Sequence, residues 1–454
     1  MAGLGSILEL GKRSLSTNQY GINVTSHNIS NASTPGYTRQ RLNVTPAAAE
    51  QTSFGYLGTG VSIQSVQRIR ESYIDQQVYT VNQNMGRASQ RENVLRLTES
   101  FLQEPSESGL NAMMSKFYSA FQDLAVHPEE NANRNSVLQR ANLLAGTFRR
   151  ISESITTLQR DVLKEAEAKV EKLNDLIGTI AELDTTIMVA SATGAVPNDV
   201  MDQRDYQLAE LSKLADVRVA DGQNGSVTVS LGGTMVLSGG NKVPLTTVMN
   251  GDQLEVYAQG STRQMRIGGG EVNALQTLNN VTFKDYRAQL DELASAFITS
   301  VNTIHTTGYG IGNPPPTGNN FFAGTDASSI ALDPSVAGNV NNIAASLSGD
   351  PGDNEIAIRI ANLQNTPVMS GNSNTMVQFY SAFVSNVGSE IQSVSTEAES
   401  ARLVQEQLTT QQNSVSGVSL DEEMTRLIQY QHGFDAAARV VTTVNDMFQT
   451  IIHM

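Results

Sequence analysis

The sequence predicts an α+β fold that is mainly helical, with a nested, discontinuous architecture. Apolar residues recur every seven positions at both ends of the chain, which is typical of helices that pair as a coiled coil. A longer apolar pattern, from about residue 134 to 190, follows helical steps of three and four. Between residues 217 and 257, short β-prone runs alternate with glycines, which predicts a small inserted antiparallel β domain.

The N-terminal segment carries a narrow apolar seam. Its members, seven residues apart, are Leu8, Leu15, Ile22 and Ile29. Much of the remaining segment is Asn, Ser, Thr and Gly, which are poor helix formers. We therefore expect this helix to be marginal alone in water, because its propensity does not offset the entropy lost on ordering.

A polar stretch, NISNASTPGYTRQ, follows this seam from Asn28 to Gln40. Within it, Pro35 suits the first central position of a type II turn, and Gly36 suits the second, where a positive φ is required. Beyond the turn, polar and apolar residues alternate loosely up to residue 45, which predicts extended chain.

The central part of the chain predicts long helices. One helix over residues 134–190 would be about 85 Å long at 1.5 Å per residue, too long for a compact domain, so we expect an elongated bundle. Residues 197–199 end this run and open another helix that reaches residue 215. Helical patterns return over residues 283–304 and from residue 376 onward.

Residues 306–370 are rich in Gly, Asn and Pro. We expect an ordered loop excursion anchored by apolar side chains, namely Phe321, Phe322, Ile330, Ile358 and Leu363. The nesting of the helices also leads us to expect the β domain at the tip of the molecule, farthest from the termini.

The C-terminal segment offers a partner for the N-terminal seam. Its a and d positions are Met424, Leu427, Gln431, Phe434, Ala438, Val441, Asn445, Phe448 and Ile452. The charges of the two segments are complementary, since the first 50 residues hold four basic and two acidic residues and residues 420–454 hold two basic and five acidic ones. Exposed ion pairs contribute only about 0–1 kcal/mol each, so apolar contacts must dominate.

These patterns predict three domains. They are a terminal helical assembly domain (1–60 and 405–454), an elongated helical-bundle domain (61–195 and 275–404, with the loop excursion 306–370) and an inserted, mainly β outer domain (196–274).

Composition excludes several functional classes. The net charge of −15 argues against nucleic-acid binding and against anionic membrane surfaces, both of which need a basic surface. The chain has no run of about 18 apolar residues, so we expect no membrane insertion, and its first 30 residues lack the pattern of a signal peptide. Because it has no cysteine, disulfides and thiolate metal sites are excluded.

We predict no catalytic, cofactor-binding or metal site. Asp202 and Asp205 could share a helix face as an acid/base pair. We interpret them instead as an acidic first turn after Asn198, stabilised by the helix dipole and by Arg204. The five histidines lack metal-ligand spacing, and Gly268–Gly270 lacks dinucleotide-binding spacing and is interpreted as a turn.

The stretch from Asn28 to Gln40 resembles the N-terminal signature of bacterial flagellar axial proteins, the superfamily of rod, hook and hook-associated proteins. Residues 419–452, SLDEEMTRLIQYQHGFDAAARVVTTVNDMFQTII, are similar to the C-terminal helix of these proteins. Internal pieces resemble the hook-associated protein 1 family, namely residues 198–205 (NDVMDQRD) with 211–212 and 217–219, residues 294–302 and 305–308, Phe321–Phe322 and Gly352–Asn354. The resemblance covers nearly the whole chain and is weakest over residues 217–270.

This resemblance implies a structural subunit that forms the hook–filament junction by polymerising through paired N- and C-terminal helices. It implies self-association in a helical layer, contacts with the hook protein and the second hook-associated protein, and a cytoplasmic export chaperone on the C-terminal region. It also implies type III export to an extracellular place in the flagellum, and no enzymatic activity. We expect the terminal seams to stay disordered in the free chain and to fold when neighbouring subunits cover them.

The residues expected at the assembly interface lie in the two terminal segments. They are Leu8, Leu15, Ile22, Asn28, Ile29, Asn31, Thr34, Pro35, Gly36, Tyr37, Arg39, Met424, Leu427, Gln431, Phe434, Val441, Asn445, Phe448 and Ile452. We expect Arg39 and Arg41 to contact acidic neighbours. Two alternatives remain open: another axial protein (a second hook-associated protein, a hook protein or a flagellin), and a secreted enzyme carried on an axial scaffold with its active site in the β domain.

Overall fold

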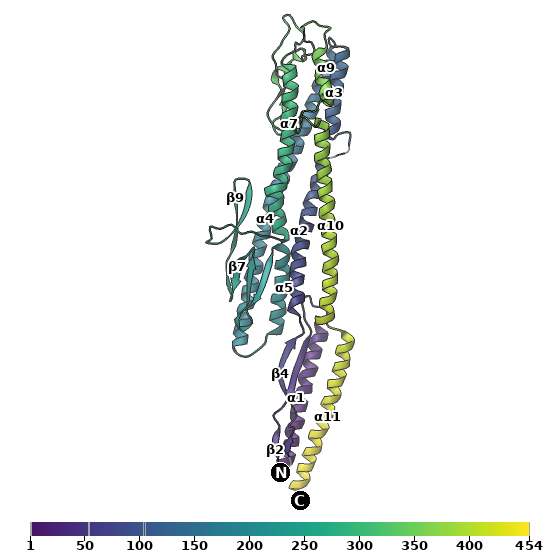
Figure 1. Ribbon diagram of the computed structural model, residues 1–454. Helices are drawn as coiled ribbons and strands as arrows, with labels where there is room; N and C mark the ends of the chain where they lie inside the picture. The colour runs from purple at the N-terminus through teal and green to yellow at the C-terminus, as the bar shows by residue number, and fades with distance from the viewer. Residues whose placement is uncertain (1, 53–54, 103, 105, 454) are drawn as a thin grey trace.

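The molecule is a long helical rod with both chain ends at the same end (Figure 1). The computed structural model describes residues 2–52, 55–102, 104 and 106–453. Long helices dominate and the sheets are small and antiparallel, which confirms the predicted α+β, mainly helical class. Within the described residues, no helix has both the length and the hydropathy needed to cross a membrane.

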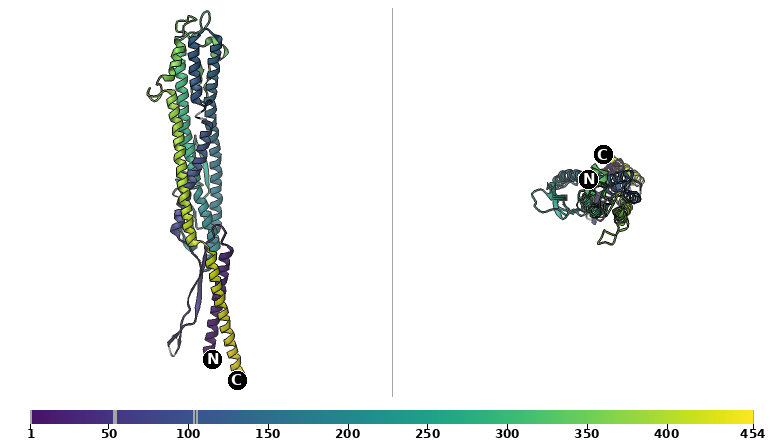
Figure 2. Two further views of the ribbon diagram at one scale, coloured as in Figure 1. Left: turned by 90° about the vertical axis from the view of Figure 1, so that its right-hand side faces the viewer. Right: turned by 90° about the horizontal axis from the view of Figure 1, so that it is seen from above.

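The lower part of the rod is called the terminal unit here and comprises residues 2–68 and 417–453. Helices α1 (Ala2–Ser30) and α11 (Leu420–Ile452) run side by side along it (Figures 1 and 2). A β arm packs against α1; its elements are β1 (Gln40–Pro46), β2 (Glu50–Thr52), β3 (Gly55–Leu57) and β4 (Val61–Arg68). Strand β1 pairs antiparallel with β4, and β2 pairs with β3 as a hairpin.

The predicted type II turn connects α1 to this arm. Gly36 has a φ of +79°, and the backbone N–H of Tyr37 donates to the carbonyl of Thr34 at 3.2 Å. A side chain other than glycine would be strained at this φ, so the turn depends on Gly36. The extended chain predicted after the turn is strand β1.

The upper and longer part of the rod is a helical bundle. Its helices are α2 (Ser72–Leu102), α3 (Leu110–Val126), α4 (Asn131–Ala192), α6 (Gly270–Thr277), α7 (Phe283–His305) and α10 (Met376–Ser416), with a π-helical turn at Leu278–Thr282. The single long helix predicted from the apolar pattern is α4, which has 62 residues. Aromatic rings fill the core near the tip, where Phe117 is fully buried and its ring centroid lies 5.1–5.9 Å from those of Phe121, Phe297, Phe321 and Phe322.

The β domain lies beside the lower half of α4 and not at the tip, so its predicted position is wrong (Figure 1). It follows α5 (Asn198–Leu214) and contains β5 (Val217–Asp221), β6 (Val227–Leu231), β7 (Thr234–Ser238), β8 (Asn241–Lys242), β9 (Leu245–Asn250) and β10 (Gln253–Ala258), with a 3-10 turn at Gln223–Gly225. The first four strands form one antiparallel sheet, and β9 pairs with β10. Because α4 runs from the tip back toward the terminal unit, the chain after it begins near the base of the bundle (Figure 1).

The tip of the rod is formed by α3 and by the ordered excursion over residues 306–370 (Figure 1). This excursion holds β11 (Phe322–Ala323), β12 (Ala331–Leu332), α8 (Pro334–Gly338), α9 (Glu355–Asn362) and 3-10 turns at Val340–Asn342 and Leu363–Asn365. Four of its five predicted anchors are buried, namely Phe321, Phe322, Ile330 and Leu363. The fifth, Ile358, is 39% exposed, because α9 turns Ile356 and Ile360 inward instead.

A histidine, His305, is buried at the tip. The Nδ1 of His305 lies 2.7 Å from the carbonyl oxygen of Asn319, and its Nε2 accepts from the backbone N–H of Ala344 at 2.8 Å. These partners fix a neutral ring with its proton on Nδ1. Burial lowers the pKa of His305 from 6.5 to about 4.

We expect the free energy of unfolding to fall as the pH drops below 6.5, because the unfolded chain then binds a proton that the folded chain excludes down to about pH 4. The expected loss between about pH 7.5 and pH 5 is about 2 kcal/mol. Chemical denaturation at both pH values measures it, and His305→Gln should remove most of this dependence. His127→Gln, a change at an exposed histidine, is the control. An unchanged pH dependence in His305→Gln would contradict the assignment.

Candidate assembly site

The polar stretch after α1 folds around Asn28, whose side chain is 1% exposed. Its Oδ1 accepts from the Tyr37 hydroxyl at 2.7 Å and from the backbone N–H of Gln40 at 3.0 Å. Its Nδ2 donates to the Gln40 carbonyl and to Glu423 Oε2, both at 2.9 Å. The amide therefore makes all four hydrogen bonds available to it, and it joins α1, the turn, β1 and α11.

Tyr37 serves this network as a hydroxyl donor. Burial, followed by the charges of Asp199, Asp202 and Glu423, raises the pKa of Tyr37 well above its ordinary value of 10. The hydroxyl therefore keeps its proton at every physiological pH and donates it to Asn28.

Arg39 connects the turn to the start of α11. Its Nε donates to Glu423 Oε1 at 2.8 Å and its Nη2 to Glu422 Oε2 at 2.7 Å. Its backbone N–H donates to the carbonyl of Ser416, at the end of α10. Glu423 is 1% exposed, so its charge depends on Arg39 and Asn28. The acidic neighbours expected for Arg39 thus lie in its own chain, whereas Arg41 is exposed.

A second group of contacts, called the joint here, attaches the terminal unit to α5. Thr38 donates through its backbone N–H to Asp202 Oδ2 at 2.9 Å and through its hydroxyl to Asp202 Oδ1. Arg68, the last residue of β4, donates to Asp202 at 2.7 Å and to Asp205 at 2.8 Å. Gln40 donates to Asp199 Oδ1 at 2.7 Å. The three carboxylates, spaced every third residue, thus all face the terminal unit.

Arg70 extends the joint into the bundle. It donates to Asp205 and to Asp75 of α2, each at 2.5 Å, and Gln412 of α10 donates to Asp75 at 3.0 Å. Arg204 donates to Asp184 of α4 at 3.1 Å and lies 3.3 Å from Asp205. The pairing of Arg204 with an acidic neighbour agrees with our interpretation of this turn.

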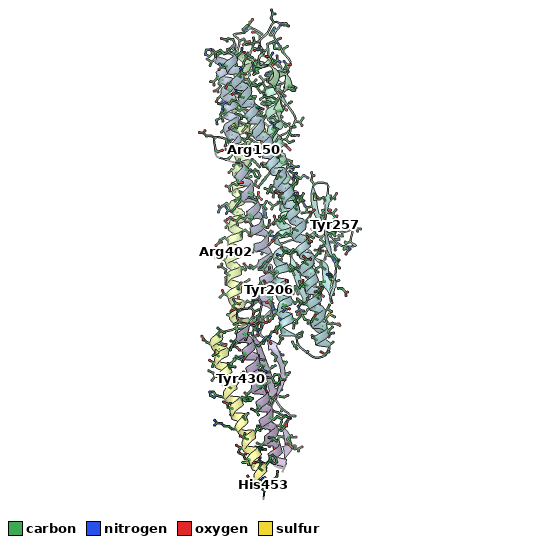
Figure 3. The ribbon with its side chains drawn as sticks, turned by 180° about the vertical axis from the view of Figure 1, so that it is seen from behind. Arg150, Tyr206, Tyr257, Arg402, Tyr430 and His453 are labelled. Atoms are coloured by element: carbon green, nitrogen blue, oxygen red, sulfur yellow. The ribbon has the colours of Figure 1, made fainter. Side chains whose placement is uncertain are left out.

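The seam between α1 and α11 consists largely of small and polar residues on the α1 side. Its buried α1 positions are Gly11, Gly21, Thr25 and Asn28, and Asn18 lies beside Gly433 of α11. A Cβ placed on Gly21 would lie 2.6 Å from ring carbons of Tyr430, and one on Gly11 would lie 2.8 Å from a methyl of Val441 (Figure 3 labels Tyr430). The absence of side chains at these glycines lets the two helices approach closely.

The predicted apolar seam of α1 is less buried than Gly11, Gly21, Thr25 and Asn28. Leu15, Ile22 and Ile29 are half-buried, and Leu8 is 36% exposed. Asn31 and Thr34 form local bonds at the end of α1, where Asn31 Nδ2 donates to the His27 carbonyl and the Thr34 hydroxyl donates to Asn31 Oδ1.

On α11, five of the nine predicted seam positions are half-buried, namely Leu427, Phe434, Ala438, Val441 and Phe448. Further packed positions include Glu423, Tyr430, Ala437 and Val444. Met424, Gln431, Asn445 and Ile452 are exposed, so their predicted pairing with α1 is wrong. Tyr430 and Ala437, each one residue before a predicted position, lie next to Gly21 and Gly11 of α1. Whether the four exposed residues contact neighbouring subunits stays a prediction.

Most residues of the joint are not predicted from the sequence. Thr38, Gln40, Arg68 and Arg70 were not singled out, nor were Asp199 or the glutamates that begin α11. The spacing of Asp199, Asp202 and Asp205 and the matched pairs Arg39/Arg41 and Arg68/Arg70 were visible in the sequence. Nothing in the sequence alone showed that these groups meet.

The models of three protein families match this chain. The flagellar hook-associated protein FlgK helical domain matches residues 95–322, just over half of the 454 residues. The flagella basal body rod protein model matches residues 8–38, and the flagellar basal body rod FlgEFG protein C-terminal model matches residues 411–454. The two rod-protein matches thus cover α1 with its turn and α11.

Relatives and a solved structure agree with these matches. Flagellar hook-associated protein 1 of Bacillus subtilis (strain 168) is 29% identical over 98% of this chain and 97% of its own length. The protein of the same name from Escherichia coli (strain K12) is 23% identical over 99% of this chain and 100% of its own. The flagellar hook junction protein FlgK from Burkholderia pseudomallei shares the fold, with a TM-score of 0.65 over 75% of this chain and 100% of that one, at 15% identity. The chain belongs to the flagellar hook-associated protein FlgK family.

Proposed function

We propose that this chain is a structural subunit of the bacterial flagellum that forms the hook–filament junction and polymerises through its terminal unit. The observation that carries the proposal is the composition of this unit. Among the described residues, none of the terminal unit belongs to either of the two apolar core clusters of the molecule. Its helices pair through small residues and leave apolar side chains such as Leu8, Met424 and Ile428 at the surface. Such a surface is stabilised when other subunits cover it.

We further propose specific partners for this surface. Copies of the chain would associate in a helical layer, bordered by the hook protein on one side and the second hook-associated protein on the other. Before export, a cytoplasmic chaperone would cover the C-terminal region, whose exposed apolar residues include Met447 and Ile451. The assembled protein would then lie outside the cell, in the flagellum.

We retain the three-part domain division as a proposal and adjust its boundaries to the observed breaks. The terminal assembly domain would comprise residues 1–68 and 417–454, because the chain crosses into the bundle after β4 and α10 ends at Ser416. The β outer domain would begin with α5, and the remaining residues would form the elongated bundle.

Removal of either terminal helix is expected to abolish filament growth, because each is half of the proposed assembly surface. The variants lack residues 2–27 or residues 421–454, and electron microscopy of cells that express each one as their sole copy gives the readout. Circular dichroism of the purified variants should show that the bundle still melts cooperatively, since its apolar core lies above the joint. A normal filament on either variant would refute assembly through paired terminal helices.

The expected disorder of the free terminal segments is also testable. We expect it only in their outer halves, which lie nearer the chain ends. The inner halves are held by Asn28 and Arg39, whereas the outer halves have only the narrow seam. Limited proteolysis read by intact mass should therefore remove residues before about Tyr20 and after about Ala437 first. Protection of both ends equal to that of α4 would contradict this prediction.

A further inference from the structure

The joint differs from the rest of the rod in the kind of contact that holds it together. Two chain segments cross it, namely the residues between β4 and α2 and the residues between α10 and α11. Its side-chain contacts include those of Thr38, Gln40, Arg68 and His27 with the acidic turn of α5, and the bond that Asn198 donates to the carbonyl of Val66. Of the residues that the structure describes, both apolar clusters lie wholly on the bundle side of this crossing.

Each arginine of this region is shared between two carboxylates. Arg68 Nη1 lies 2.7 Å from Asp202 and 2.8 Å from Asp205. Arg70 is shared in the same way between Asp205 and Asp75. A guanidinium group shared in this way can move away from one carboxylate and toward the other, and it stays paired throughout the movement. The contact therefore tolerates small rotations that an interdigitated apolar core would resist.

Two hollows border the joint and leave room for such a rotation. A cavity of about 200 Å³ lies between the turn at Gly36–Thr38, Tyr206 of α5 and the end of α10 at Ser416. A groove of about 540 Å³ is lined by Val24 and His27 of α1 and by residues 196–200, and His27 Nε2 lies 3.2 Å from Asp199 Oδ1 beside it. Figure 3 labels Tyr206 where the terminal unit meets the bundle. The terminal unit and the bundle thus contact each other along a polar strip that lies between this cavity and this groove.

The network around Asn28, unlike the contacts at the joint, consists of buried hydrogen bonds that cannot be exchanged for others. It contains a neutral amide with all four hydrogen bonds satisfied and the buried Glu423–Arg39 pair, both inside the terminal unit. Loss of any of these bonds would leave a buried polar group without a partner. We therefore expect the inner half of the terminal unit to move as one body.

We propose that the joint is a hinge, at which the inner half of the terminal unit tilts as a rigid body against the bundle while Arg68 and Arg70 redistribute between their carboxylates. This inference rests on the proposed function. A subunit placed between two different assemblies must fit two sets of neighbours. A tilt of the terminal unit against the bundle meets that requirement. Asp202 sets the resting angle, because it holds both Thr38 and Arg68.

Distances between pairs of nitroxide labels test the proposal on the full chain, which has no native cysteine. One label pair spans the joint (Tyr20→Cys with Val189→Cys), one lies within the terminal unit (Tyr20→Cys with Ile428→Cys) and one lies within the bundle (Val189→Cys with Leu403→Cys). All four positions are exposed. Each pair is measured by pulsed electron paramagnetic resonance in the otherwise unchanged chain, in Asp202→Asn and in Asp221→Asn, a control at an exposed carboxylate of β5.

We expect a distance distribution across the joint about twofold broader than within either body, and broader still in Asp202→Asn, where an amide N–H₂ opposes the donors of Thr38. Asp221→Asn should change none of the three distributions. A joint distribution as narrow as that within the bundle would overturn the hinge. A broad distribution within the terminal unit would overturn the rigid-body motion. Neither result would contradict the proposed assembly through the terminal unit, which the terminal truncations test separately.

Discussion

Replacement of Asn28 by aspartate is expected to abolish junction assembly, although it changes a single atom of the side chain. The carboxylate cannot donate to the Gln40 carbonyl or to Glu423, both of which now accept from Nδ2 at 2.9 Å. It also places a second negative charge against Glu423, which is buried. The cost to the folded terminal unit is about 2–6 kcal/mol, since each of the two unpaired buried groups costs about 1–3 kcal/mol.

Asn23→Asp is the matched control for this prediction. It makes the same chemical change five residues earlier on α1, where the side chain is exposed. Filaments counted by electron microscopy should be absent in Asn28→Asp and normal in Asn23→Asp. Normal filaments in Asn28→Asp, with the protein at its usual level, would show that the Asn28 network is dispensable.

Replacement of Gly21 by leucine is expected to separate α1 from α11. Even a Cβ at this position would lie 2.6 Å from carbons of the Tyr430 ring, and a leucine adds three further carbons beyond it. Overpacking of this kind costs about 1–3 kcal/mol, which a seam without an apolar core offsets poorly. Assembly should therefore fail, and proteases should cleave the terminal helices faster than in the unchanged chain.

Two variants make this prediction specific. Gly5→Leu alters the same helix at a site where a Cβ would have nothing within 4 Å, so it should preserve the seam. Tyr430→Ala combined with Gly21→Leu should restore part of the protection, because it removes the ring that the leucine meets. If Gly21→Leu and Gly5→Leu behave alike, the glycine contact does not hold the helices together.

Local patterns in the sequence predicted the elements whose burial follows one simple period. The apolar residues of α4 alternate steps of three and four over much of its length, and the helix forms as predicted because that stripe faces the bundle core. Pro35 and Gly36 similarly predict their turn, because backbone sterics at these two residues depend little on the remaining chain. The helix that begins at Asn198 was predicted for the same local reason.

The terminal seam shows where this reasoning fails. Apolar spacing selected Leu8, Leu15, Ile22 and Ile29, yet α11 packs against the glycine side of α1. A heptad pattern identifies an apolar stripe but not the neighbour that covers it. The glycines let α11 approach α1 closely, and the predicted apolar stripe is half-buried or exposed within the chain.

The sequence by itself determined the class of fold, the long helices, the turn and the membership of an axial family, since each depends on local pattern or on the chemistry of a short signature. Only the tertiary structure decided that the β domain lies beside the base of the bundle, that Asn28 meets Glu423, and that Thr38 and Arg68 meet Asp202. These contacts join residues between 134 and 395 positions apart. Their partners are set by where α4 and α10 return the chain, and no local propensity encodes that return.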